Sequence, residues 1–325
     1  MKKLILLFLL ITSFASAQDI HFSQMYTAPL YLNPAKTGFF NGSYRYTAVY
    51  RNQWASVTIP YSTISSSADI NFVSNSNDLF GIGLLTYSDK AGDSKFTTNS
   101  FDLSLAYAKC LDRYKKAYMN FGLQVGYTES YLDYSALYFN ENYNGGNLTE
   151  TFVSNVYGYF DINYGIQGYY LIDKDRSFEM GFSQFHINHP VQTFTNDFTA
   201  TIPEKYIVNI GVSFPIKSVI FYPKIVYENQ FPHQELIFGS MSKISSEKSN
   251  NITKTFYAGV LCRWDDAIIL VTKLDRNQWS FHFSYDINYS SLSKASHFLG
   301  GPEIAIQYIG KFKHTKPHKI YCPVL

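Results

Sequence analysis

Apolar and polar residues alternate along several stretches of this chain. In Asn277–Tyr289 every second residue, from Trp279 onward, is aromatic or aliphatic, and the residues between them are polar. The segments 62–72, 116–131 and 157–170 show the same period of two. This is the period of a β-strand, in which successive side chains point to opposite faces of the sheet. The pattern therefore predicts an all-β protein.

About fourteen strands are expected from this alternation and from the turn residues between them. The face opposite the aromatic side chains is small and mostly neutral, whereas a soluble sandwich would present many Lys and Glu side chains to solvent. An even strand number with a polar interior is typical of bacterial membrane barrels. We predict a transmembrane antiparallel β-barrel, and a secreted β-sandwich is the alternative. The predicted strands lie near 43–52, 61–73, 79–90, 94–109, 116–131, 157–172, 176–187, 203–217, 219–230, 233–243, 253–264, 266–275, 277–290 and 299–312.

The composition agrees with a barrel. Aromatic residues make up 18% of the chain and charged residues 16%, whereas soluble globular proteins usually have roughly 25% charged residues. After the first residues, no apolar run is long enough to form a membrane-spanning helix. Strands that alternate between lipid and lumen need many aromatic side chains and few charges, so this composition favours the barrel over the sandwich.

The first residues have the three parts of a secretory signal peptide. Met1–Lys3 is positively charged, Leu4–Phe14 is apolar but short, and Ala15–Ala17 is a small-residue cleavage site. Loss of the two lysines would take the formal charge from +2 to 0, which leaves no basic excess for binding nucleic acid. The expected organisation is a signal peptide (1–17), an irregular segment (18–42), an outer-membrane barrel (43–312) and a periplasmic tail (313–325).

The stretch Gln18–Gly38 resembles neither the signal peptide nor the strands. Pro29 and Pro34 lack a backbone donor and bias the residues before them away from helical angles. The stretch is still too apolar for a free tail, because burial of its side chains would be stabilising. We expect it at or in the periplasmic mouth, with its aromatic residues packed in the lumen or across the opening; the alternative is a passive extension. The candidate plug or partner-binding residues are Phe22, Gln24, Tyr26, Pro29, Leu30, Tyr31, Asn33 and Pro34.

The lengths of the connections predict an orientation. If the N-terminus is periplasmic, the two longest connections, 132–156 and 188–202, both lie outside the cell. Long loops of bacterial barrels are extracellular and their short turns are periplasmic. The connection Ser242–Ile252 is longer than expected for the periplasmic side.

Reactive side chains do not assemble into a convincing catalytic site. His282 and Ser284 share one strand face with Asp286, and a Ser–His pair on a barrel wall is one form of lipase site. Side chains two residues apart on a strand point in parallel, whereas a nucleophile needs a base aimed at its hydroxyl. We therefore interpret these residues as polar lumen residues and expect no enzyme activity. His186 and His189 are expected to be loop residues at a strand end.

The C-terminal tail carries a second candidate for chemistry. His314, His318 and Cys322 are spaced by four, which would suit metal ligands on a helix, but prolines interrupt the segment. We expect no metal and no cofactor. With three cysteines, at least one is unpaired within the chain. Cys110 and Cys322 would both lie on the periplasmic side, where a disulfide between them is chemically permitted.

Several short motifs point further. The mature N-terminus begins Gln-Asp-Ile-His-Phe-Ser-Gln, Tyr46–Trp54 ends in Arg-x-Gln-Trp, and the chain closes on Cys322–Pro323. Ala28–Ala35, Gly181–His186 and Gly301–Ile304 add three more pieces. Together they resemble the PorP/SprF family of outer-membrane proteins of Bacteroidetes. Lys36 and the Val324–Leu325 ending depart from the family pattern.

This resemblance implies a non-enzymatic barrel tied to type IX secretion and gliding motility. Besides outer-membrane lipids, the implied partners are other type IX secretion components or a periplasmic peptidoglycan-binding lipoprotein. The resemblance also implies a role in the export or surface attachment of a secreted adhesin, with its C-terminal domain as a partner. A porin-like or hydrophobic-solute transporter is the alternative, and an outer-membrane lipid hydrolase is the weakest of the three.

Overall fold

The computed structural model describes residues 19–53, 59–74, 76–92, 95–137, 154–194, 198–249, 252–290, 293 and 298–313. The predicted signal peptide therefore lies outside the described residues, as do His314, His318 and Cys322. Among the described cysteines, Cys110 and Cys262 are not disulfide-bonded. The proposed pairing of Cys110 with Cys322 falls outside this part of the chain.

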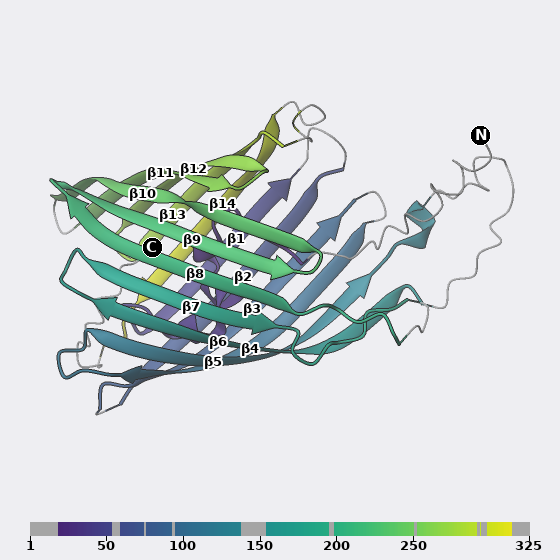
Figure 1. The fold of residues 1–325 in the computed structure, drawn as a ribbon, viewed down its shortest axis with the longest axis horizontal. Coiled ribbons are helices and arrows are strands. Elements are labelled where there is room, and N and C mark those ends of the chain that lie inside the picture. The colour runs from purple at the N-terminus through teal and green to yellow at the C-terminus, as the bar shows by residue number, and fades with distance from the viewer. Residues whose placement is uncertain are drawn as a thin grey trace, which may run out of the picture.

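Fourteen antiparallel strands close into one barrel (Figure 1). Each strand pairs with its neighbours in sequence, and β1 closes the ring by pairing with β14, from Tyr44↔Gly310 to Arg51↔Glu303. The predicted fold and strand count are confirmed. The strands are β1 (Tyr44–Gln53), β2 (Tyr61–Val73), β3 (Leu79–Ala91), β4 (Phe96–Cys110), β5 (Ala117–Tyr131), β6 (Val156–Leu171), β7 (Ser177–Phe185), β8 (Lys205–Ile216), β9 (Val219–Gln230), β10 (His233–Ser249), β11 (Ile252–Arg263), β12 (Ala267–Arg276), β13 (Trp279–Asn288) and β14 (Leu299–Gly310).

The two faces of each strand follow the alternation in the sequence. Along β13 the aromatic residues Trp279, Phe281 and Phe283 are exposed on the outside, whereas His282 and Ser284 are buried in the lumen. The same division holds along β2, β5 and β6. The outer wall is therefore a continuous apolar surface suited to lipid, and the lumen takes the polar side chains.

The two ends of the barrel differ in the length of their connections. One end, here the long-connection end, holds the two longest connections, 132–155 and 186–204. The opposite end, here the short-turn end, holds turns such as 172–176, 217–218 and 277–278, together with the start of β1 and the end of β14.

The β10–β11 hairpin corrects one expectation about the short-turn end. The stretch predicted as a long connection continues instead as paired strand, from Ser245↔Phe256 to Ser249↔Ile252, after a register shift at Ile244. The pairing of β10 with β9 ends at Lys243↔Ile220. The last residues of this hairpin therefore extend beyond β9, while β11 stays paired with β12 as far as Lys254↔Arg276.

The segment before β1 lies inside the ring of strands (Figure 1). It contains three single helical turns, η1 (Met25–Thr27), α2 (Pro29–Leu32) and η2 (Pro34–Lys36). Pro29 and Pro34 each start a turn, and the residues before them, Ala28 and Asn33, have non-helical angles, as the sequence predicts. No helix among the described residues is long and apolar enough to span a membrane.

This lumen segment, Asp19–Ser43, runs the length of the barrel. Ser43 lies at the short-turn end, where its amide donates to the carbonyl of Gly310 at 2.7 Å. Asp19 lies at the long-connection end, where its amide donates to Gln230, the last residue of β9, at 3.0 Å. The segment thus joins β1 at the short-turn end, and its first described residue lies at the opposite end of the lumen.

An arginine on the outer face tests which surface meets the lipid. Leu103, at the middle of β4, is 45% exposed on that face. Leu103→Arg should destabilise the folded barrel by about 2–4 kcal/mol, because burying the charge at mid-membrane depth is costly. Leu111→Arg, just beyond the end of the same strand, should cost only about 0–1 kcal/mol. Urea titration of the refolded barrels in lipid vesicles measures both; equal costs would contradict the assignment of the lipid face.

Candidate functional site

Apolar side chains of the lumen segment form the hydrophobic core of the barrel. Phe22 and Leu30 are completely buried, and Tyr31 packs edge-on against Phe22 with ring centroids 5.5 Å apart. Each fully buried large apolar side chain contributes about 1.5–3 kcal/mol, so this packing holds the segment firmly. The wall residues in the same cluster are Val49, Leu85, Phe185, Ile207, Val226, Ile237, Met241, Tyr257, Leu261, Ile269, Val271 and Ala305.

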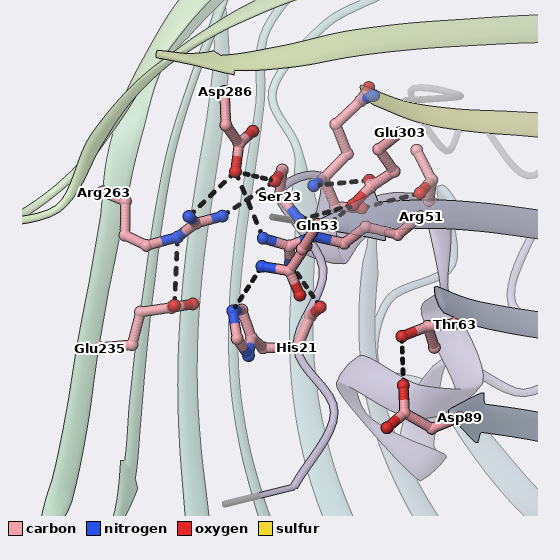
Figure 2. Close-up of polar contacts among 12 residues, drawn as sticks. His21, Ser23, Arg51, Gln53, Thr63, Asp89, Glu235, Arg263, Asp286 and Glu303 are labelled. Carbon is pink, nitrogen blue, oxygen red and sulfur yellow. Dashed lines mark hydrogen bonds and ion pairs between the residues drawn. The ribbon is translucent and has the colours of Figure 1, made fainter. Parts of the chain in front are cut away.

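A buried glutamate of the wall binds the backbone of the segment (Figure 2). The amide groups of Ser23 and Gln24 donate to the two carboxylate oxygens of Glu303, at 2.7 and 2.9 Å. Arg51 of β1 lies with its Nε 3.9 Å from Glu303 and donates to the carbonyl of His21. The Glu303–Arg51 ion pair of the wall therefore satisfies the amide groups of Ser23 and Gln24 and the carbonyl of His21. These backbone groups have no sheet partner.

A second buried carboxylate connects two arginines to the segment. Oδ2 of Asp286 lies 3.2 Å from Nη2 of Arg51 and 3.0 Å from Nη1 of Arg263. It also accepts a hydrogen bond from the Ser23 hydroxyl at 2.7 Å. Arg263 in turn lies 3.1 Å from Glu235 of β10. Removing one partner of a buried ion pair typically costs about 3–5 kcal/mol, so these pairs hold β1, β10, β11 and β13 around the segment.

Asp19 anchors the segment at the long-connection end. Its Oδ2 lies 2.7 Å from the Lys205 ammonium and 2.8 Å from Nε2 of His186. On its other side, the His186 ring lies 3.0 Å from Asp161 of β6. The Lys205 ammonium also donates to the hydroxyl of Tyr31 at 2.8 Å. The start of the segment is thereby joined to β6 and β8 and to the connection after β7.

Charges keep this anchor ionised despite its burial. Burial raises the pKa of Asp19, but the charges of Lys205 and His186 outweigh that effect and hold the pKa well below its usual range. Burial lowers the pKa of His186, whereas the carboxylates of Asp19 and Asp161 outweigh that effect and raise the pKa to about 9. At neutral pH Asp19 is therefore negatively charged and His186 is positively charged.

Glycines on one side of the barrel make room for the middle of the segment. A Cβ added at Gly122 would overlap the backbone of Pro34 and Ala35, and one at Gly165 would overlap the side chain of Asn33. Glycine is required at these places because the segment touches the wall directly. These glycines, here the glycine track, are Gly81 and Gly83 on β3, Gly122 on β5, Gly165 on β6 and Gly181 on β7.

Asn33 fixes the segment against the glycine track. Its Nδ2 donates to the carbonyls of Ile166 and Phe182, at 3.1 and 3.2 Å, in two adjacent strands. Its Oδ1 accepts from the amide of Ala35 at 2.9 Å and caps the turn that follows. Nearby, the Ser183 hydroxyl donates to the carbonyl of Leu32 at 2.8 Å.

The end of the segment is held by two more charged contacts. The Lys36 ammonium lies 2.9 Å from the Glu179 carboxylate of β7. Asp69 of β2 accepts from the amide of Gly38 at 2.8 Å and forms a buried ion pair with Arg45 at 2.6 Å. Lys36, a departure from the family pattern, therefore has a partner in the barrel wall.

The structure buries every candidate residue that the sequence indicated. Gln24 and Asn33 are, like Phe22 and Leu30, 0% exposed. The Tyr26 hydroxyl lies 3.1 Å from both the Gln24 side-chain oxygen and the sulfur of Met241, and these two acceptors share its one proton. Pro29 and Pro34 start the turns that lay the segment along the wall.

The candidate catalytic pair is not assembled in the described chain. His282 and Ser284 are both buried in the lumen, but the Ser284 hydroxyl has no hydrogen-bond partner among the described residues. A serine nucleophile needs a base within hydrogen-bond distance of its hydroxyl. Within the same residues, no group of three or more His, Cys, Asp and Glu side chains is placed to hold a metal ion.

Most of the charged anchors were not expected from the sequence. His186, expected as a loop residue, follows β7 but is 5% exposed and lies between two carboxylates. Arg51, His186 and Glu303 stand inside motifs that carried the family resemblance, yet nothing in those motifs shows that they meet. In the sequence they could have been noticed only as charged residues or a histidine, at or next to positions on a lumen face that was otherwise expected to be neutral.

Among the described residues, two cavities lie at the long-connection end, next to the start of the lumen segment. One has a volume of about 390 Å³ and is lined by Asp19, Ile20 and His21 of the segment together with the ends of β2–β6. The other, about 240 Å³, lies on the side of β10, β11 and β13. His21 and Gln53, whose side chains lie 3.5 Å apart, border both cavities.

Comparisons with known proteins return one family and several barrels. The sequence matches the model of the family described as type IX secretion system membrane protein PorP/SprF over residues 14–305. No curated protein matches the sequence. The structure is similar to the CymD monoaromatic hydrocarbon channel, at 9% identity and a TM-score of 0.48 over 89% of this chain and 94% of that one. It is also similar to the P. putida toluene transporter TodX, at 9% identity and a TM-score of 0.48 over 87% of this chain and 93% of that one.

Alanine in the glycine track should loosen the segment. Gly122→Ala places a methyl group against the backbone of Pro34, and overpacking of this kind typically costs about 1–3 kcal/mol. Gly168→Ala on β6 is the control, because its added Cβ would lie 3.7 Å from the nearest atom. Thermal unfolding and proteolysis at Lys36 measure the effect. Equal stability and equal cleavage in the two variants would contradict close contact between segment and wall.

The Asp19 anchor should weaken in alkaline solution. Folding raises the pKa of His186 from 6.5 to about 9. The stability gained from this proton is therefore complete below pH 6.5, declines between pH 6.5 and 9, and is absent above pH 9. Melting temperatures of the wild type and His186→Gln, measured from pH 6 to 10, should converge as the pH rises. His189→Gln is the control, since His189 is more than half exposed; a constant gap between the wild type and His186→Gln would refute the assignment.

Proposed function

Since this chain belongs to the PorP/SprF family of type IX secretion system membrane proteins, we propose that it is a closed accessory barrel of that machinery. The protein is an outer-membrane β-barrel. In this role it supplies a fixed, non-enzymatic site of attachment in the membrane, and no substrate passes through its lumen.

The observation that carries this proposal is the occupied lumen. The segment Asp19–Ser43 runs from one end of the barrel to the other and is bound along its path by Glu303, Lys205 and the glycine track. A channel needs an open path or a plug that is readily displaced. Displacing this segment would expose its apolar side chains and break several buried ion pairs, each worth about 3–5 kcal/mol when one partner is lost.

The orientation of the barrel gives each end a partner. Short turns of bacterial barrels face the periplasm and long loops face the outside. The short-turn end then meets periplasmic secretion components or a peptidoglycan-binding lipoprotein. The long-connection end faces the exterior, where the C-terminal domain of a secreted adhesin would be held.

Conductance distinguishes the closed barrel from a porin or solute transporter. In planar lipid bilayers the wild type should pass no resolvable current. A variant lacking residues 18–32 should conduct, because the deletion removes the aromatic core of the segment but leaves Asn33 and the turn that follows it. Retention of the compact band of the folded barrel in unheated gels shows that the variant folds. Steady conductance by the wild type would contradict the proposal.

Recovery of partners tests the attachment role. An affinity tag inserted in the connection 132–155 leaves the short-turn end unaltered. Purification from cross-linked envelopes should recover type IX secretion components, a peptidoglycan-binding lipoprotein or an adhesin C-terminal domain. Recovery of none of these from envelopes that contain the folded barrel would count against the proposal, whatever the conductance result.

A further inference from the structure

The larger cavity at the long-connection end combines aromatic walls with acidic groups. It has a volume of about 390 Å³, within the range of small-ligand sites. Five aromatic residues line it, and two of them, Tyr157 and Tyr159, stack on each other with ring centroids 6.4 Å apart. The aromatic residues are Tyr61, Tyr87, Phe96, Tyr157 and Tyr159.

The charged residues of the lining are all acidic. Among the described residues that line the cavity, Asp19 and Asp89 are charged and none is a lysine or arginine. The charge of Asp19 is neutralised by Lys205 and His186. Asp89 of β3 accepts a hydrogen bond from the Thr63 hydroxyl at 2.5 Å; the charge of Arg51 acts on it, but the two form no ion pair in the described part of the chain. The cavity therefore contains one carboxylate whose charge is not balanced by a neighbouring ion pair.

The cationic side chain of Arg51 already forms ion pairs with other carboxylates. Figure 2 draws Asp89 with its contact to Thr63 and with no ion pair to Arg51. The Arg51 guanidinium is bound by the carboxylates of Asp286 and Glu303 and by the carbonyl of His21. If it turned towards Asp89, Glu303 would lose its ion pair and Asp286 would keep only Arg263, and loss of a buried partner is strongly destabilising.

The floor of the cavity is closed. Asp19, Ile20 and His21 form it, and below them the segment is bound by Glu303. A solute that enters from the long-connection end therefore meets a blind pocket, so that the cavity can bind a ligand but does not lead into a channel.

We propose that this cavity is a binding site for an organic cation with an apolar stem, the chemistry of an arginine or lysine side chain. The cationic head lies against Asp89, and the stem packs between the tyrosine rings. Aromatic faces attract such heads through the negative charge of the ring face, and more strongly where water is excluded. A carboxylate that pairs with a guanidinium in such a setting adds a charge-assisted hydrogen bond.

Calorimetry on the purified, folded barrel tests the site with matched probes. N-acetyl-arginine methylamide carries the cation, and N-acetyl-citrulline methylamide has nearly the same shape without the charge. The arginine probe should bind at least tenfold more tightly than the citrulline probe. Equal affinities, or no binding of the arginine probe at millimolar concentration, would overturn the proposal.

Two variants locate the interaction. Asp89→Asn keeps a partner for Thr63 but removes the charge, and it should lower the affinity for the arginine probe at least tenfold without affecting the citrulline probe. Glu129→Gln is the matched control, because Glu129 lies at the same end of the barrel but faces outward from β5. Unchanged affinity in Asp89→Asn, with its melting temperature preserved, would also overturn the proposal.

A third probe distinguishes the source of the cation. Butylguanidine lacks the amide groups of a polypeptide. If it binds as tightly as the arginine probe, the site accepts any organic cation of this class; if it binds more weakly, the site recognises the side chain within a polypeptide. Either result supports the cation site. The binding test needs only the folded barrel, so its failure would leave the proposed secretion role unaffected.

Discussion

The structure depends on one constraint, which is that an irregular backbone inside a barrel must have all its polar groups satisfied by the wall. A segment without sheet partners leaves amides and carbonyls unpaired, and each such buried group is costly. Glu303 and Arg51 meet this need on two sides of Ser23 and Gln24, since one accepts from the amides and the other donates to the preceding carbonyl. Because these two side chains are themselves buried, they pair with each other, and Arg51 pairs with Asp286 as well.

The same constraint bears on how the barrel is assembled. The segment precedes β1 in the chain, and β1 pairs with β14 to close the ring. The groups that bind the segment come from early strands, such as Arg51 of β1, and from the last strand, through Glu303. Other partners, such as Glu179 of β7 and Lys205 of β8, come from the middle of the chain, so the full set of contacts exists only in the closed barrel. This arrangement makes it an integral part of the core, unlike a domain inserted into a finished pore.

A closed lumen changes what the two mouths can do. With the centre filled, the proposed function depends on the surfaces and cavities at the ends of the barrel and on its position in the membrane. The motif residues Arg51, His186 and Glu303, scattered along the chain, meet around the lumen segment. The features that make the sequence similar to a secretion family are thus the same ones that close this barrel, and the proposed cation site lies directly above them.

The lipid-facing wall follows from local pattern. Alternation such as that around Trp279 depends on neighbouring residues alone, so the strands, their number and their outward faces could be predicted from the sequence. The burial of Phe22 and Leu30 could be predicted too, because apolar side chains between prolines need a partner. The charged anchors could not, because Asp19, His186 and Lys205 are far apart in the chain and become neighbours only when the ring closes.

The direction of the segment was likewise decided by tertiary structure. From the sequence by itself one could predict a membrane barrel with an apolar N-terminal segment at its mouth. That this segment crosses the whole lumen depends on where Glu303 and Lys205 lie along the wall and on the space left by Gly122 and Gly165. The role of a glycine on a lumen face, or of a single acidic residue on a strand, depends on the residues that pack against it. Those contacts are formed only in the tertiary structure.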